Sequence, residues 1–333
     1  MKKIMYIEIA VIIVLLIVSI TVCAHVTRNR PADLPDLPQS ESTPTNAPVE
    51  NTTEPSAEPT EAPGPTWMTV PAGRQLLAQQ YFVYSLEADD FVTTSAIPEE
   101  RVYPASVTKL FTCYVALQYL QPGTMITCGK ETTWIDPASS VAWVTPGDRV
   151  SVELLIQGMM MQSGNDAAYA TAVAAGRVLA EDPAYPAKQA VTLFMEEVNR
   201  QAQELGLTGT HFATPDGLDR FDHYTTAQDM LAIALLALEN PLLRHYCSLS
   251  KTSVMYENGE TYTYQSTNYL LQPSSQYYCA DACGMKTGTT KKAGSCLMSL
   301  FHNGDGYILI GIFGCPKYED RFADALQLYA RYG

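Results

Sequence analysis

The stretch SCLMSLFHNGDGYILIGIFG, residues 295–314, decides the fold that the sequence predicts. Two largely apolar runs, SCLMSLFH and YILIGIFG, flank the tetrapeptide NGDG, whose residues favour turns. This pattern predicts a β-hairpin near the end of the chain. Just before it, MKTGTT (residues 285–290) is expected to begin another strand, and residues 319–332 are expected to form a closing helix.

Strands are also predicted at the start of the folded part, where QQYFVYSLEADDFVTTS (residues 79–95) contains two short runs of Tyr, Phe, Val and Thr. Between the two ends, apolar residues recur at helical spacing in five segments: residues 107–120, 152–161, 166–180, 190–205 and 226–239. We therefore predict an α/β domain over residues 67–333. It would contain one antiparallel sheet built from both ends of the domain, flanked by helices, with a mostly helical lobe.

The composition of the chain limits which classes of partner are expected for this domain. The formal net charge of the 333 residues is -14, and no basic patch is visible in the sequence. Binding to a phosphate backbone requires clustered Lys and Arg, so nucleic acid is not an expected partner. The spacing of the cysteines and histidines does not match a zinc site, and neither a metal nor an organic cofactor is implied.

The N-terminal part of the sequence predicts that the protein is exported. Lys2 and Lys3 precede an apolar run that extends from Ile9 to about Ala24, so residues 1–27 are expected to be a cleaved signal peptide or an uncleaved signal anchor. Residues 28–66 follow as a linker rich in Pro, Glu and Thr. Within it, residues 31–66 hold seven acidic residues, nine of the 21 prolines and no Lys or Arg. Such a segment has too little apolar surface to fold, so we expect a disordered spacer.

Seven of the eight cysteines lie beyond the apolar N-terminal run, so at least one must stay unpaired within the chain. Cys113 and Cys296 lie in apolar stretches, where a buried thiol is expected. Cys279 and Cys283, in CADAC, are the only pair placed for a local bridge, and the sequence leaves open whether they form one.

Two serine–lysine pairs share the spacing Ser-x-x-Lys: Ser106 with Lys109 and Ser248 with Lys251. Chance alone yields about one such pair in a chain of this composition, so context must separate them. Ser106 opens a buried helical segment, which would bring Lys109 one turn further along on the same face. A buried lysine can lose its proton and serve as the base that a serine nucleophile needs. Ser248 instead precedes a Thr- and Tyr-rich stretch.

Two further motifs follow the first pair in order: Ser163-Gly-Asn165 interrupts a helical run, and Lys286-Thr-Gly288 begins the strand noted above. With them the chain resembles the low-molecular-weight penicillin-binding proteins that act as serine-type D-alanyl-D-alanine carboxypeptidases. The resemblance covers residues 78–333 through RVYPASVTKL, MMMQSGNDAAYA, TPDGLD, HYTTAQDM, STNYLL and GMKTGTTKKAGSC. It implies the serine β-lactamase and penicillin-binding-protein transpeptidase-like fold, and SGN in place of SDN favours this family over class A β-lactamases.

By this resemblance Ser106 is the acylated nucleophile, Lys109 is its base and Ser163 relays a proton. The resemblance also implies a set of substrate-binding residues: Asn165, Lys286, Thr287, Gly288, Thr289 and Arg321. Lys286 would attract the terminal carboxylate of a D-Ala-D-Ala stem peptide and depress the pKa of Lys109. The backbone N–H groups of Ser106 and Thr289 would form the oxyanion hole.

The resemblance implies an enzyme that removes the terminal D-Ala from peptidoglycan stem peptides through an acyl-enzyme and that β-lactam antibiotics inhibit. Its expected location is the extracytoplasmic face of the bacterial cell membrane, held there by the N-terminal segment, or the exterior if that segment is cleaved. Three alternatives remain open: a D,D-endopeptidase, a weak β-lactamase on the same scaffold, and a non-catalytic module that binds cell wall or β-lactams.

Two further features of the sequence bear on the expected site: a departure from the family pattern, and the positions of the histidines. Where the family usually has Asn-Pro-His-Gly-Leu, this chain has Thr-Pro-Asp-Gly-Leu, with Asp216 at the centre. No Gly-x-Ser-x-Gly motif accompanies the histidines, so a Ser-His-Asp triad is not expected. Four histidines are instead expected in turns or at the surface: His211, His223, His245 and His302.

Overall fold

The computed structural model describes residues 74–95, 99–304 and 306–333. The predicted signal segment (residues 1–27) and spacer (residues 28–66) lie outside these residues, and so does the start of the predicted domain. None of the helices in the described part of the chain combines the length and the apolar character needed to cross a bilayer.

The predicted hairpin is confirmed as the centre of a six-stranded antiparallel sheet. β11 (Gly294–His302) pairs with β12 (Tyr307–Cys315), and Phe301 lies opposite Ile308 next to the turn. β10 (Thr287–Thr290) continues the sheet beyond β11, and β9 (Ala282–Gly284) pairs with another part of β11.

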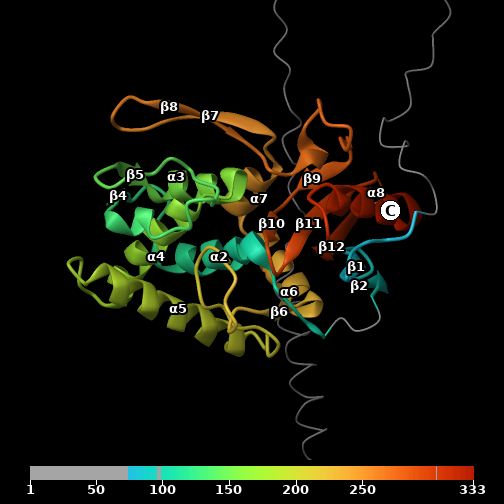
Figure 1. Cartoon of the computed structure of the whole chain (residues 1–333), viewed down its shortest axis with the longest axis horizontal. Helices are drawn as coiled ribbons and strands as arrows, with labels where there is room; N and C mark the ends of the chain where they lie inside the picture. The colour runs from blue at the N-terminus through green and yellow to red at the C-terminus, as the bar shows by residue number, and fades with distance from the viewer. Residues whose placement is uncertain (1–73, 96–98, 305) are drawn as a thin grey trace, which may run out of the picture.

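The opposite side of the hairpin is extended by the N-terminal strands. β1 (Gln80–Ser85) lies against β12, and β2 (Asp90–Thr94) forms the edge, so the order is β10-β11-β12-β1-β2. Segments more than 200 residues apart in the sequence are therefore neighbours in space, as Figure 1 shows. The prediction of one sheet built from both ends of the domain is confirmed.

Alternate residues of the strands face two different layers. Ile310 and Ile312 belong to a core shared with Phe322 and Leu326 of α8 (Asp320–Tyr332). Their neighbours Leu309 and Phe313 belong to the larger core of the helical lobe. Because successive side chains of a strand point to opposite faces, this alternation places the sheet between α8 and the helical lobe.

The helical lobe lies between the two halves of the sheet in sequence (Figure 1). Its helices occupy the segments predicted from periodicity, with one short addition, α7: α2 (Lys109–Tyr119), α3 (Val152–Gln157), α4 (Asn165–Leu179), α5 (Ala187–Glu204), α6 (Ala227–Glu239) and α7 (Pro241–Ser248). Three two-stranded ribbons complete it: β3 (Arg101–Val102) with β6 (Thr225–Thr226), β4 (Met125–Thr127) with β5 (Arg149–Ser151), and β7 (Lys251–Met255) with β8 (Thr261–Gln265).

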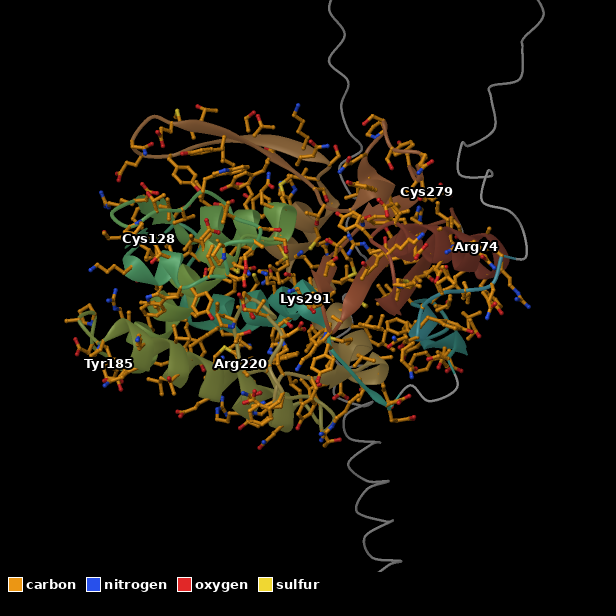
Figure 2. The ribbon with its side chains drawn as sticks, viewed as in Figure 1. Arg74, Cys128, Tyr185, Arg220, Cys279 and Lys291 are labelled. Atoms are coloured by element: carbon orange, nitrogen blue, oxygen red, sulfur yellow. The ribbon has the colours of Figure 1, made fainter. Side chains whose placement is uncertain are left out.

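The seven cysteines of the described residues are all free thiols, so Cys279 and Cys283 form no local bridge. Cys113 and Cys296 are fully buried, as predicted. In Figure 2, Cys128 lies in the helical lobe, whereas Cys279 and Arg74 lie on the side of the molecule that contains the sheet and α8.

Candidate active site

The three motifs meet where the helical lobe adjoins β10. Ser106 lies in η2 (Ala105–Thr108), a short 3-10 turn, and Lys109 is the first residue of the α-helix that follows. The prediction that one continuous helix carries both residues is therefore corrected: a tighter turn comes first. The Ser106–Lys109 contact survives this change because both helix types bring residues three apart close together.

The Lys109 side chain is held by three acceptors. Its Nζ donates hydrogen bonds of 2.8 Å to Ser106 Oγ, to Asn165 Oδ1 and to the backbone oxygen of Asp216. These acceptors can take all three protons of an ammonium group. The amine is therefore fixed against the hydroxyl that it would have to deprotonate.

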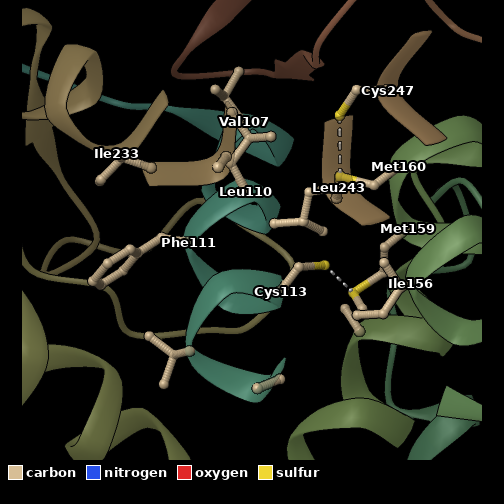
Figure 3. Close-up of a cluster of buried hydrophobic side chains, with 14 of the residues drawn as sticks. Val107, Leu110, Phe111, Cys113, Ile156, Met159, Met160, Ile233, Leu243 and Cys247 are labelled. Carbon is tan, nitrogen blue, oxygen red and sulfur yellow. Dashed lines mark hydrogen bonds between the residues drawn. The ribbon is translucent and has the colours of Figure 1, made fainter. Parts of the chain in front are cut away.

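Burial explains how this amine can act as a base. Lys109 is fully enclosed, and desolvation lowers its pKa from 10.5 to about 8, although the charge of Asp216 pulls the pKa upward. The residues that follow Lys109 on α2 pack into an apolar core: Figure 3 shows Leu110, Phe111 and Cys113 there, with Cys113 in contact with Met159. A lysine on the first turn of a helix with such a core beneath it loses its hydration.

Lys286 faces Ser163 from the strand side of the site. Its Nζ donates to Ser163 Oγ at 3.0 Å and to the backbone oxygen of Thr287 at 2.8 Å. Burial first, and the positive charge of Lys109 second, hold the pKa of Lys286 well below its usual range. The sequence predicts that burial and the charge of Lys286 both lower the pKa of Lys109. Burial is the main cause for both lysines, and the charge of Lys286 is not among the leading influences on Lys109.

Ser163 is positioned by an unusual stretch of backbone. A π-helical segment, η4 (Gly158–Gln162), follows α3, and Ser163 then adopts a left-handed conformation with φ of 59°. Such a conformation is uncommon for a residue other than glycine and is concentrated at functional sites. Asn165 begins the next helix, and its Nδ2 donates to Ser139 Oγ at 2.9 Å.

Gly288 allows β10 to lie directly against the serine turn. A Cβ atom at this position would come within 2.7 Å of the Ser106 backbone nitrogen and 2.9 Å of the Ala105 Cβ atom. Any other residue would push the strand away. The strand therefore passes close to the backbone N–H of Ser106, one of the two groups predicted to form the oxyanion hole.

Arg321 of α8 lies behind β10 and is completely buried. Its Nη1 donates to the Gly288 oxygen at 2.8 Å and to Thr289 Oγ1 at 2.9 Å, while Nε and Nη2 have no hydrogen-bond partner. The guanidinium stacks on the Tyr318 ring at 3.9 Å. The Thr287 hydroxyl also has a hydrogen-bond partner, because it lies 2.5 Å from the Thr267 hydroxyl.

The second serine–lysine pair is not brought together as a site. Ser248 ends α7 and donates to the backbone oxygen of His245 at 2.8 Å, whereas Lys251 is exposed at the start of β7. Within the described chain, no three or more His, Cys, Asp or Glu side chains are arranged to hold a metal ion.

Two residues next to the site were missed by sequence reasoning. His223 was expected in a turn or at the surface: it closes the turn that begins at Arg220, but its side chain is buried behind the serine turn and not at the surface. Its Nε2 lies 2.9 Å from Thr108 Oγ1, and its Nδ1 accepts from the Ala213 backbone N–H at 3.0 Å. Thr108 in turn donates to the Ala105 oxygen, so the ring supports the turn that carries Ser106.

The second residue, Asp216, stands out in the sequence only as a departure from the family pattern, and its contacts were not predicted. It is buried, its Oδ1 accepts from the Leu218 backbone N–H, and its Oδ2 has no partner. Its backbone oxygen accepts from Lys109 and, at 3.4 Å, from Ser106 Oγ. No local pattern signals these contacts, because they join loops more than 100 residues apart in the sequence.

The D-alanyl-D-alanine carboxypeptidase family model matches residues 68–312. D-alanyl-D-alanine carboxypeptidase DacA of Haemophilus influenzae is 31% identical over 262 residues, which are 76% of this chain and 61% of that protein. DacC of Escherichia coli is 33% identical over 69% of this chain and 55% of its own length. The matched region thus spans somewhat more than half of these relatives.

Solved structures agree with the fold. The crystal structure of the Streptomyces K15 DD-transpeptidase has a TM-score of 0.69 and 26% identity to this chain, and the match covers 77% of this chain and 97% of that one. Because the family model covers most of the described domain, the chain belongs to the D-alanyl-D-alanine carboxypeptidase family.

Proposed function

We propose that this protein is a serine-type D-alanyl-D-alanine carboxypeptidase that removes the terminal D-Ala from peptidoglycan stem peptides. The observation that carries the proposal is the 2.8 Å contact between Ser106 Oγ and the buried Nζ of Lys109. The pKa of that amine, lowered by burial to about 8, leaves a usable fraction of free base near neutral pH.

In the acylation step, Ser106 Oγ attacks the carbonyl carbon of the penultimate D-Ala and its proton passes to Lys109 Nζ. The tetrahedral oxyanion is held by the backbone N–H groups of Ser106 and Thr289, next to Gly288. The C–N bond then breaks, and the leaving amine takes a proton that Ser163 relays from the lysines. The products of this step are D-alanine and an ester on Ser106.

In the second step, water attacks the ester, its proton goes to Lys109, and Ser106 Oγ recovers a proton as the shortened peptide leaves. The substrate carboxylate would be bound by Lys286 and Thr287. Arg321 would contribute through Thr289. Lys286 lies beside Ser163, and Arg321 is buried behind β10, where it is hydrogen-bonded to Thr289. Asn165 would orient the substrate amide once its own contacts rearrange.

A second candidate is transfer to an amine in place of water. The relevant observation is that the K15 protein is named a DD-transpeptidase in its crystal structure and a D-alanyl-D-alanine carboxypeptidase among the curated relatives, where it is 30% identical to this chain. Both reactions share the acylation step. Endopeptidase activity, which also begins with acylation of Ser106, is compared in the same assays, and β-lactamase activity would be measured as loss of the penicillin adduct with time.

The predicted location follows from the same proposal. Stem peptides lie outside the cell membrane, so the domain would act there, held by residues 1–27 or released after their cleavage. The spacer of residues 28–66 would separate the catalytic domain of residues 67–333 from the bilayer. β-Lactams would acylate Ser106 as stem-peptide analogues.

The test is mass spectrometry of the full-length protein after exposure to a penicillin, with Ser106→Ala and Ser248→Ala in parallel. We expect one covalent adduct on the wild type and on Ser248→Ala, and none on Ser106→Ala. D-Alanine release from a linear pentapeptide, from a cross-linked muropeptide and with an added amine acceptor then separates the candidate activities. Labelling of Ser106→Ala, or no labelling at all, would refute the catalytic proposal and favour a binding module.

A further inference from the structure

An aromatic platform lies away from the catalytic residues, where a loop meets the β7–β8 ribbon. The Trp143 ring stacks on Tyr262 at 5.4 Å with an interplanar angle of 6°, and on Tyr264 at 6.0 Å. The two tyrosines are two residues apart on β8, so they point to the same face of the ribbon. Both tyrosine rings stack against the indole, and Trp143 remains 40% exposed.

The backbone holds this tryptophan in a strained conformation. Trp143 has φ of 60°, which a bulky side chain rarely adopts. The buried carboxylate of Asp166 fixes the residues on either side, because it accepts from the N–H groups of Ala142 at 2.8 Å and Val144 at 2.9 Å. The Ala142 oxygen also accepts from Tyr264 Oη at 2.9 Å. The indole is therefore presented rigidly, and strain of this kind is maintained where a site requires it.

A small polar cavity adjoins the platform. It has a volume of about 260 Å³ and is lined by Gly147, Asp148, Arg149, Tyr256, Glu257 and Asn258. Tyr256 connects the two features, since its ring lies 4.9 Å from that of Tyr262. The ion pair between Arg149 and Glu257, 3.1 Å long, links the two walls. The ionisable lining is two carboxylates and one guanidinium, which disfavours an anionic ligand.

This combination suits a neutral sugar. A pyranose ring presents an apolar face of C–H groups, which packs on an aromatic ring, and a rim of hydroxyl and amide groups, which bind carboxylate, amide and guanidinium side chains. A purely apolar partner would leave the charged lining of the cavity without partners.

The ribbon also places the platform at a suitable distance from the site. At its base, Thr267 is hydrogen-bonded to Thr287 of β10. Tyr262 lies five residues back along the strand, at most about 17 Å away. About four residues of an extended stem peptide, counted from the scissile bond toward the sugar, span about 14 Å. A stem peptide held in the site can therefore bring its glycan end near Trp143.

We infer that Trp143, backed by Tyr262 and flanked by the cavity at Asp148 and Asn258, binds an N-acetylated sugar of the glycan strand that carries the stem peptide. The inference rests on the proposed function and adds the glycan to its substrate. It makes the enzyme selective for stem peptides that are still attached to sugar.

The test compares two substrates of the full-length protein, a free pentapeptide and the same pentapeptide attached to its N-acetylglucosaminyl-N-acetylmuramyl disaccharide. The concentration of active sites in each sample is determined from the amount of penicillin adduct. The variant is Trp143→Gly, because glycine accepts positive φ without strain and removes the ring. Met255→Ala is the control, since Met255 lies on the same ribbon and is 72% exposed. The readout is the ratio of kcat/KM for the two substrates.

We expect the wild type and Met255→Ala to prefer the disaccharide substrate about tenfold and Trp143→Gly to show a ratio near one. The loss should lie in KM rather than kcat. Equal kcat/KM for both substrates in the wild type, or a preference that survives Trp143→Gly, would overturn the inference and leave the carboxypeptidase proposal standing. Absence of both the penicillin adduct and D-alanine release would overturn the two together.

Discussion

The charge of Asp216 opposes the effect that burial has on Lys109. Burial lowers the pKa of this lysine to about 8, and Asp216 is the leading influence in the other direction. We expect Asp216→Asn to lower the Lys109 pKa further, so the rise of acylation rate with pH should move to lower pH. At one unit below a pKa only about one-tenth of an amine is neutral, so the gain at pH 7 is at most about tenfold.

The measurement is the rate of penicillin acylation from pH 5.5 to 9.5. Asp219→Asn is a matched control, because this carboxylate is on the same loop but binds Thr290 Oγ1 and the Lys292 N–H. Coincident pH profiles for the wild type and Asp216→Asn would contradict the electrostatic role.

His223 makes a second residue-scale prediction, on stability. Burial lowers its pKa from 6.5 to about 3, so the folded protein keeps the ring neutral while the unfolded chain takes up a proton below pH 6.5. The unfolded state then binds more protons, and stability must fall as pH falls from 6.5 toward 3, by about 1.4 kcal/mol per pH unit from this group.

Urea unfolding at several pH values checks this. His223→Gln should be less stable than the wild type at pH 7, because the Ala213 N–H loses its acceptor, but its stability should decline less between pH 6.5 and 4. His302→Gln, at an exposed position of β11, should follow the wild-type decline. If His223→Gln declines as steeply as the wild type, the buried neutral ring is not the cause.

At this scale the sequence located the residues that carry a motif and missed those that act through packing. Ser106, Lys109 and Ser163 stand in short patterns with chemical meaning. His223 and Asp216 lie in segments that resemble the family, HYTTAQDM and TPDGLD, but no short pattern assigns them a chemical role. Their contacts form only when residues 213–217 fold against the serine turn.

At the scale of elements, Gly288 determines how close β10 comes to the serine turn. Gly288→Ala would place a Cβ atom 2.7 Å from the Ser106 nitrogen, so the strand or the turn must move. We expect acylation to fall on the order of 10²-fold, as displacements of about 1 Å do in active sites, with about 1–3 kcal/mol of lost stability. Penicillin labelling rates and thermal unfolding measure both effects.

Gly123→Ala is the control for this substitution, since a Cβ at Gly123 meets nothing within 4 Å. It should label at the wild-type rate. Wild-type labelling by Gly288→Ala would mean that the close approach of β10 is not needed for acylation.

The elements with strong periodicity were predictable, and those that depend on local distortion were not. The hairpin of β11 and β12 and the long α5 follow from apolar spacing and turn residues. The π-helical segment before Ser163 and its left-handed backbone do not, because they are stabilised by contacts across the fold. One is the hydrogen bond from the Asn165 N–H to the Ser140 oxygen.

At the scale of the whole molecule, the sheet is complete only when the two ends of the domain come together. Its formation therefore depends on contacts between residues far apart in the sequence. Asp324 of α8 is central to these contacts. Its Oδ2 accepts from the backbone N–H groups of Leu77 and Ala78, at 2.7 and 2.8 Å, and its Oδ1 accepts from Arg74 at 2.8 Å. One buried carboxylate thus ties the segment that leads into β1 to the last helix of the chain.

Asp324→Ala should therefore destabilise the protein by about 3–5 kcal/mol, because it leaves two backbone donors unpaired as well as removing an ion pair. Arg74→Ala should cost less, about 1.5–3 kcal/mol, because it removes one charged hydrogen bond while the buried carboxylate keeps its two backbone N–H donors. Urea unfolding measures both, and penicillin labelling across the same transition should be lost together with the tertiary signal, because the site uses β10 and the helical lobe. Equal effects of the two substitutions would show that Asp324 acts only through its charge.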